Sequence, residues 1–300
     1  MTLPAFELGW FLLSVACAFL TATTAMLSKL LLKKNSVFFV GWARFLFALP
    51  VFVLLLWLRR PIMHLEPAFW KIVVILLPFE LAAFLVFLKA LKISPLSLTF
   101  PLLGLTPLFA VLFSYILLRE APNAAGIAGI ILVAFGAYLL NINTVTKGLL
   151  EPIKAIYREK GSLLMLLVAF VYGVTSVLGK KAVMLSSPLS FAAIYYTIFL
   201  IIFTPLAAIK GRKDIAELRQ GLGKNLLLML ALGSSFAAAM ILHFKAVLLV
   251  NVSYMISVKR VSLLIGVGYG ALIFKERNIK SRLLGSFVML AGVLLLGFSQ

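Results

Sequence analysis

The sequence predicts an all-α membrane protein in which ten transmembrane helices form two inverted repeats of five helices each. Apolar runs recur along the whole chain, and a helix needs about 20 apolar residues to cross roughly 30 Å of hydrocarbon. Only 12% of the 300 residues are charged, whereas a soluble domain has about 25%. A backbone in lipid must satisfy its own hydrogen bonds, so these runs are expected to be helices. The two halves of the chain also resemble each other.

The expected spans follow one another with short polar hinges between them. The first run has no basic segment before it and is too long for a signal peptide, so no cleavable signal is expected. The fourth run contains three prolines, Pro95, Pro101 and Pro107, which bend or break a helix. The longest hinges are 142–161 and 211–224, and the first separates the expected repeats 1–143 and 144–300. The ten spans are expected near 8–32, 36–58, 69–90, 95–118, 122–141, 162–184, 188–209, 225–248, 252–274 and 282–298.

The basic residues are distributed unevenly over the hinges. Most of the 28 Lys and Arg residues lie in or beside hinges that follow odd-numbered spans. Cytoplasmic hinges collect Lys and Arg, so both termini are expected to face away from the cytoplasm. The net charge of +19 is then explained by topology and by contact with lipid headgroups. The bilayer is therefore an expected partner, and nucleic acid is not.

An internal repeat supports the division into two halves. Residues 82–140 align with 238–296 without a gap, and the matched pairs include Lys89 with Lys245. Glu120 and Glu276 also match, while the first spans align less cleanly through Lys29 and Lys180. Five spans in each half would place the second half upside down relative to the first. Inverted repeats are typical of transporters, whose substrate site lies near the midplane between the repeats.

Four short segments resemble the EamA family of the drug/metabolite transporter superfamily. They are ALKISPLS at 90–97, LRE at 118–120, ISVKRVS at 256–262 and FKE at 274–276. The resemblance covers essentially the whole chain. It implies a carrier that exports amino acids or other metabolites, and it implies cytoplasmic termini, which conflicts with the distribution of basic residues. The VKRV run at 258–261 is also similar to triose-phosphate/phosphate translocators, in which the matching Lys and Arg hold the anionic group of the substrate.

Ionisable residues inside spans are costly and mark candidate functional sites. Lys259 and Arg260 lie within the expected ninth span. Adjacent helical positions diverge by about 100°, so at least one of the two is expected to face the protein interior. A Lys charge beside an Arg fork suits a phosphate or a carboxylate. Alternatively, the pair is structural, satisfied by Glu80 or backbone carbonyls, or it extends toward an interface.

Three further residues complete the candidate set. Glu80 is the only acid well inside a span, and it is open to three roles: coupling a proton, binding a substrate amine, or neutralising Lys259 or Arg260. Arg44 is open to structural pairing, headgroup contact or substrate binding. His243 lies near a span end and either titrates near neutral pH or packs in the core. The other histidine, His64, lies in a hinge, so no metal or cofactor site is expected.

Small residues suggest where helices approach closely. The run GVGYG at 266–270 resembles a potassium-channel filter, but it lies inside a full-length expected span, and a filter needs a re-entrant loop. Its spacing suits close helix packing instead. Pairs of small residues with three residues between them also occur at 125–129 and 281–285. These two faces are expected to pack either within one chain or between the chains of a homodimer.

The sequence therefore predicts a secondary transporter of a small polar metabolite, with an anionic substrate as the leading hypothesis. The expected substrate-binding residues are Lys259, Arg260, Glu80 and Arg44. The alternatives are an amino-acid or amine exporter that uses Glu80, and a flippase of lipids or lipid-linked sugars. An enzyme is not expected, because no paired carboxylates, metal motif or nucleophile–base set falls on the spans. The expected location is the plasma (inner) membrane.

Overall fold

A computed structural model describes residues 5–59, 65–119, 122–139, 154, 158–220, 222–276 and 279–298, and it has no strand in those residues. Glu120, His64 and the proposed boundary at 143/144 lie outside the described residues. Eight helices are long and apolar enough to cross a membrane. They correspond to eight of the ten expected spans. The apolar parts of the remaining two, Ala124–Gly136 and Arg282–Leu295, are shorter, so a count of ten crossings stays a prediction.

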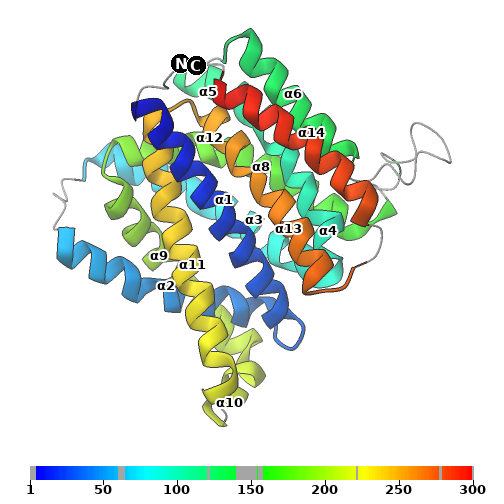
Figure 1. Ribbon diagram of the computed structural model, residues 1–300. Coiled ribbons are helices and arrows are strands. Elements are labelled where there is room, and N and C mark those ends of the chain that lie inside the picture. The colour runs from blue at the N-terminus through cyan, green and yellow to red at the C-terminus, as the bar shows by residue number, and fades with distance from the viewer. Residues whose placement is uncertain are drawn as a thin grey trace.

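The helices of the first half follow the expected spans closely (Figure 1). They are α1 (Ala5–Leu32), α2 (Val37–Arg59), α3 (Pro67–Ile93), α4 (Leu96–Thr99), the 3₁₀ helix η1 (Phe100–Leu105), α5 (Thr106–Leu118) and α6 (Ala124–Leu139). The second half contains α8 (Lys160–Met184), α9 (Pro188–Lys210), α10 (Arg212–Gln220), α11 (Leu222–Leu249), α12 (Val252–Lys259), α13 (Val261–Leu272) and α14 (Ile279–Phe298). The short helix α10 lies within the expected polar hinge 211–224.

The fourth helix of each half is broken. In the first half, α4, η1 and α5 replace one straight helix, and Pro101 and Pro107 begin two of these segments. This confirms the expected bend, because each proline lacks a backbone donor. The expected span near 252–274 is present as Val252–Leu272, but its helix is interrupted, which was not predicted from the sequence. The span breaks at Arg260, whose amide donates to the carbonyls of both Ile256 and Ser257, at 3.1 and 2.9 Å, in a tightened turn between α12 and α13.

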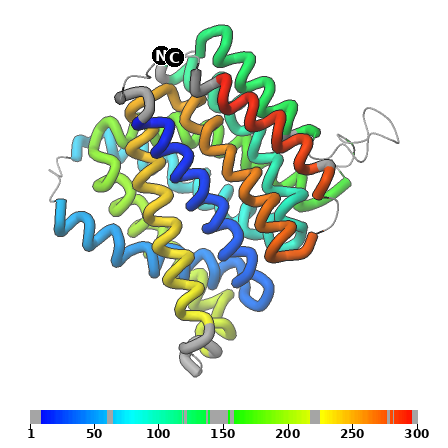
Figure 2. Tube along the Cα trace, in the orientation of Figure 1, coloured from blue at the N-terminus to red at the C-terminus, as the bar shows by residue number. Residues whose placement is uncertain are grey.

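The two halves interlock rather than stand side by side. The first helix of each half packs on the third long helix of the other, α1 on α11 and α8 on α3. The second and last helices pair across the halves, α2 with α9 and α6 with α14. Figure 2 shows the start of α1 and the end of α14 at one end of the bundle, with α10 at the opposite end. The core is therefore shared by both halves.

A pair of equivalent hydrogen bonds agrees with the internal repeat. The Nζ of Lys29, near the end of α1, donates to the backbone carbonyl of Ser94 at 2.6 Å. The Nζ of Lys180, near the end of α8, donates to the carbonyl of Val250 at 3.0 Å. The two carbonyls occupy aligned positions, just after the third long helix of each half. Each lysine thus joins the first helix of its half to the start of the broken fourth helix.

The small residues of α6 and α14 are used within one chain. A Cβ added to Gly136 would lie 2.7 Å from the carbonyl oxygen of Gly285, and one added to Gly292 would lie 2.8 Å from that of Gly129. Larger residues would force the helices apart, because backbone atoms cannot yield as side chains do. These faces therefore pack against each other inside the monomer. The small-residue faces of α6 and α14 therefore give no support to a homodimer, which stays a prediction.

Glu159 caps the start of α8 and joins it to the first half. Its carboxylate accepts hydrogen bonds from the hydroxyl of Ser94 and from the amide of Ser162. Partial burial raises the pKa of Glu159, but these hydrogen bonds outweigh burial, and the net pKa lies below the ordinary value. The capped form is therefore stabilised wherever the carboxyl is ionised.

We expect Glu159→Gln to lower the free energy of unfolding in detergent by about 1 kcal/mol at neutral pH. A lowered carboxyl pKa contributes stability that is fully present above the unfolded pKa and is lost as the pH falls through the folded pKa. The difference between Glu159→Gln and the native chain should therefore vanish in acid. Thermal unfolding of both proteins over a pH series measures this difference. A gap that persists unchanged in acid would contradict the ionised cap.

Candidate functional site

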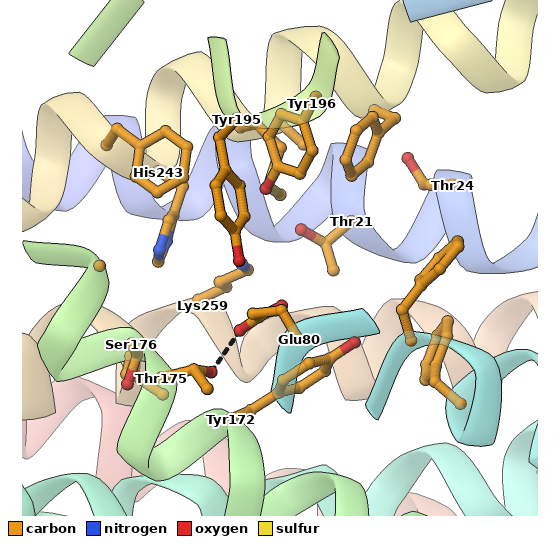
Figure 3. A pocket seen from close by; sticks show the side chains of 18 of the residues that line it. Thr21, Thr24, Glu80, Tyr172, Thr175, Ser176, Tyr195, Tyr196, His243 and Lys259 are labelled. Atoms are coloured by element: carbon orange, nitrogen blue, oxygen red, sulfur yellow. Dashed lines mark hydrogen bonds between the residues drawn. The ribbon is translucent and has the colours of Figure 1, made fainter. Parts of the chain in front are cut away.

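A central cavity of about 170 Å³ lies between the two halves (Figure 3). Its wall is formed by α1, α2, α3, η1 and α5 of the first half and by α8, α9, α11 and α12 of the second. One water needs roughly 10–15 Å³ by the same kind of measure, so the cavity has room for several waters or for a small solute. Its position between repeats is where transporters bind their substrates.

All four predicted site residues line this cavity. Lys259, Arg260, Glu80 and Arg44 come from three helices and from the break between α12 and α13. Only 4% of Arg44 and 5% of Arg260 is exposed. The structure thus brings three cations and one carboxylate to the wall of one cavity. Their role in substrate binding stays a prediction.

Glu80 is held by a neutral partner. Its carboxylate accepts a hydrogen bond from the hydroxyl of Thr175, which joins α3 to α8 across the halves. Among the described residues, no Lys or Arg nitrogen lies within the 4.0 Å of an ion pair with Glu80. Direct neutralisation by Lys259 or Arg260, one of the alternatives drawn from the sequence, is therefore not seen in this conformation.

Arg44 is enclosed by aromatic rings. Its Nη2 donates to the hydroxyl of Ser28 at 2.6 Å. Its guanidinium carbon lies 4.6, 5.4 and 5.9 Å from the ring centroids of Phe84, Phe236 and Phe87. Such contacts attract a cation to the negative ring faces and stabilise it without a counter-ion. Arg44 is therefore partly satisfied by the protein itself.

Lys259 and Arg260 are less well satisfied. Within the described residues, the Lys259 ammonium makes no hydrogen bond or ion pair, and the Nε of Arg260 has no hydrogen-bond partner. In Figure 3 the Lys259 amine points into the cavity between Glu80 and Tyr195. An unpaired buried charge is costly, so water or an anionic ligand that pairs with it is favoured. The break between α12 and α13 thus presents the cavity's free positive charge.

Comparison with known families now identifies the chain. The model of the EamA-like transporter family matches residues 8–142 and again residues 159–298. The chain belongs to the EamA-like transporter family. It is therefore an integral, multi-pass membrane protein of the drug/metabolite transporter superfamily, and its family points to transport rather than to enzyme catalysis.

The fold of this EamA-like protein is also known from solved structures. One crystal structure of a protein is similar with a TM-score of 0.67 and 17% sequence identity, over 99% of both chains. At that identity the similarity establishes the fold alone. No curated protein gives a significant match. The similarity of the Lys-Arg run to triose-phosphate translocators is tested by none of these comparisons and stays a prediction.

Sequence reasoning missed the aromatic wall of the EamA-like cavity. Phe45 on α2 is its centre, with ring centroids 5.0 Å from Phe84, 5.1 Å from Phe199 and 5.6 Å from Phe236. These rings come from four helices, so no local spacing reveals the cluster. The abundance of phenylalanine, 25 residues, is a signal too general to locate it. The wall gives the cavity an apolar surface that also surrounds the Arg44 guanidinium.

Two further polar side chains line the cavity, one whose role the sequence left open and one that the sequence did not indicate. His243 and Tyr195 both line the cavity. The Nδ1 of His243 and the hydroxyl of Tyr195 are buried without a hydrogen-bond partner in the described residues. Either can bond a solute or water that enters the cavity. His243 was identified from the sequence with two possible roles, whereas nothing in the sequence singled out Tyr195.

Proposed function

We propose that the protein carries a small organic anion across the membrane, and that Lys259 and Arg260 bind its anionic group. The excess of cations in the central cavity is the observation that supports this most. Arg44, Lys259 and Arg260 face one carboxylate, Glu80. In a cavity of low dielectric such an excess attracts anions strongly. Carboxylate and phosphate groups match the donors of Lys and Arg.

The uncharged part of the substrate would pack on the aromatic wall. Phe45 and its neighbours cover the side of the cavity formed by α2, α3, α9 and α11. Burial of apolar area contributes about 25 cal/mol per Å². A substrate with a compact anionic group and an apolar body would therefore use both parts of the cavity.

Alternating access would arise from the two halves, 1–143 and 144–300, arranged as inverted repeats. Both halves contribute to the cavity wall, and the broken fourth helices α4–η1–α5 and α12–α13 lie beside it. Rocking of one half against the other would expose the cavity to each side of the membrane in turn. Glu80, which has no cationic partner within ion-pair distance, would take up and release the coupling proton.

An amine or amino-acid exporter is the second candidate. It is favoured by the same isolation of Glu80, whose carboxylate is bonded only by Thr175 among the described residues. Aromatic rings also stabilise ammonium groups. The three cations of the cavity oppose this alternative for a simple amine. The flippase alternative and the choice of membrane stay predictions.

A screen of uptake into liposomes tests the proposal. The purified protein would be reconstituted, and carboxylated and phosphorylated metabolites would be compared with amines and neutral analogues of similar size. Ligands are first selected by the rise in unfolding temperature that they cause, since a ligand that binds the folded state stabilises it. We expect saturable uptake of anions. Uptake of amines alone would contradict the proposal and favour the exporter.

A further inference from the structure

Three carboxylates join the two halves, on segments near the end of the bundle that holds α10 in Figure 1. Each belongs to the second half, and each accepts a hydrogen bond from a serine of the first half. The pairs are Ser36 with Asp214, Ser94 with Glu159, and Ser97 with Glu276.

The first pair joins the turn before α2 to α10. Both the amide and the hydroxyl of Ser36 donate to the Oδ2 of Asp214, at 2.9 and 2.6 Å. Ser36 and Asp214 are partly exposed. This contact is therefore accessible to water from the α10 end.

The pair of Ser97 with Glu276 joins α4 to the segment after α13. Glu276 accepts from the amides of Leu96 and Ser97, both at 3.0 Å, and also from the Ser97 hydroxyl. A Cβ on Gly270 would lie 2.9 Å from the Glu276 carboxylate, so the close approach depends on glycine there. Lys275 adopts a positive φ of 51°, which turns the chain so that Glu276 reaches back to α4.

The pair of Ser94 with Glu159 joins the end of α3 to the start of α8. Glu159, before α8, accepts from the hydroxyl of Ser94, and Ser94 directly precedes the broken fourth helix. The Nζ of Lys29 holds the Ser94 carbonyl from α1. The three pairs thus tie α2 and the start of the fourth span to three separate segments of the second half.

The opposite end of the bundle is fastened differently. There the amide of Asn123 donates to the hydroxyl of Tyr254 at 3.0 Å, a neutral contact. Glu66, the described carboxylate at the start of α3, makes no side-chain capping bond. Among the described residues, the carboxylate contacts between the halves are therefore the three at the α10 end and the Glu80–Thr175 contact inside the cavity.

We propose that the three serine–carboxylate pairs form a gate, which closes the cavity at the α10 end and must break before a substrate passes there. Charge-assisted hydrogen bonds are stronger than neutral ones. Contacts between two rocking bodies must part on the side that opens. The gate rests on the proposed alternating access but not on the charge of the substrate.

Labelling of a thiol in the cavity tests the gate. In a Cys17→Ser background, Thr21→Cys places one thiol on the wall of the cavity. A membrane-impermeant maleimide is then applied from the α10 side of sealed vesicles. The side is identified with a separate Lys213→Cys variant, because Lys213 is exposed on α10. We expect Ser36→Ala to raise the labelling rate about tenfold, and Glu276→Gln to raise it as well.

Matched variants keep the test decisive. Ser36→Thr retains the hydroxyl and should label at the original rate. Ser186→Ala removes a serine that bonds the Ala182 carbonyl inside its own half, and it should also change nothing. An unchanged rate in a folded Ser36→Ala protein, with Glu276→Gln likewise unchanged, would overturn the gate. Because labelling needs no substrate, a protein that opens as expected but transports no anion would contradict only the proposed function.

Discussion

The double variant Lys259→Ala with Arg260→Ala is expected to lose uptake of the organic anion by about 100-fold or more. Hydrogen bonds to charged groups contribute about 1.5–3 kcal/mol each, so two such contacts correspond to at least that factor. The loss should not come from misfolding. The Nε of Arg260 has no hydrogen-bond partner among the described residues, and neither cation forms an ion pair there, so the substitutions leave no buried counter-charge unpaired.

Initial rates of uptake into liposomes measure this effect, with unfolding temperatures as a check on folding. Lys245→Ala is the matched control, since Lys245 is an exposed lysine on α11 outside the cavity. Arg260→Lys keeps the charge but loses the planar fork, and it should transport at an intermediate rate. Anion uptake that survives the double substitution would remove Lys259 and Arg260 from the mechanism.

Glu80→Gln is expected to abolish concentrative uptake driven by a pH gradient while leaving exchange of substrate across the membrane. Glutamine can still accept the Thr175 hydrogen bond that Glu80 accepts, so the packing of α3 against α8 should persist. The glutamine amide does not titrate, however, so proton coupling should fail. We expect accumulation to fall at least tenfold, by the loss of one titrating group.

Two assays separate these effects. Uptake against a gradient reports coupling, and counterflow between substrate-loaded and external pools reports binding and movement. Glu66→Gln serves as the control, because Glu66 is an exposed acid before α3. Loss of counterflow as well as accumulation would favour Glu80 as a substrate ligand. Full insensitivity to Glu80→Gln would contradict both the coupling role and the amine exporter.

Much of the fold could be predicted because lipid imposes a simple rule on sequence. The long apolar runs and their hinges locate the helices to within a few residues, and three prolines mark the break between α4 and α5. The break at Arg260 could not be found in the same way. No proline or glycine marks it, and it depends on one amide that bonds two carbonyls of its own helix.

The individual residues of the candidate site could be predicted from the sequence, but their convergence on one cavity could not. Lys259, Arg260, Glu80 and Arg44 stand out because a charge inside a span is costly. Their convergence depends on how the halves interlock, which no spacing in the chain encodes. The rings around Arg44 and the three serine–carboxylate pairs could not be predicted from the sequence for the same reason. Serine and phenylalanine are common residues, and only their tertiary partners make them distinctive.

The most direct test of the account is the accessibility of one thiol in the cavity, Thr21→Cys, from each side of the membrane. Alternating access predicts that an impermeant reagent labels it from either side in turn, and that a saturating organic anion slows labelling from both. Labelling from one side only, whether or not the anion is present, would contradict a carrier whose cavity opens alternately between two halves.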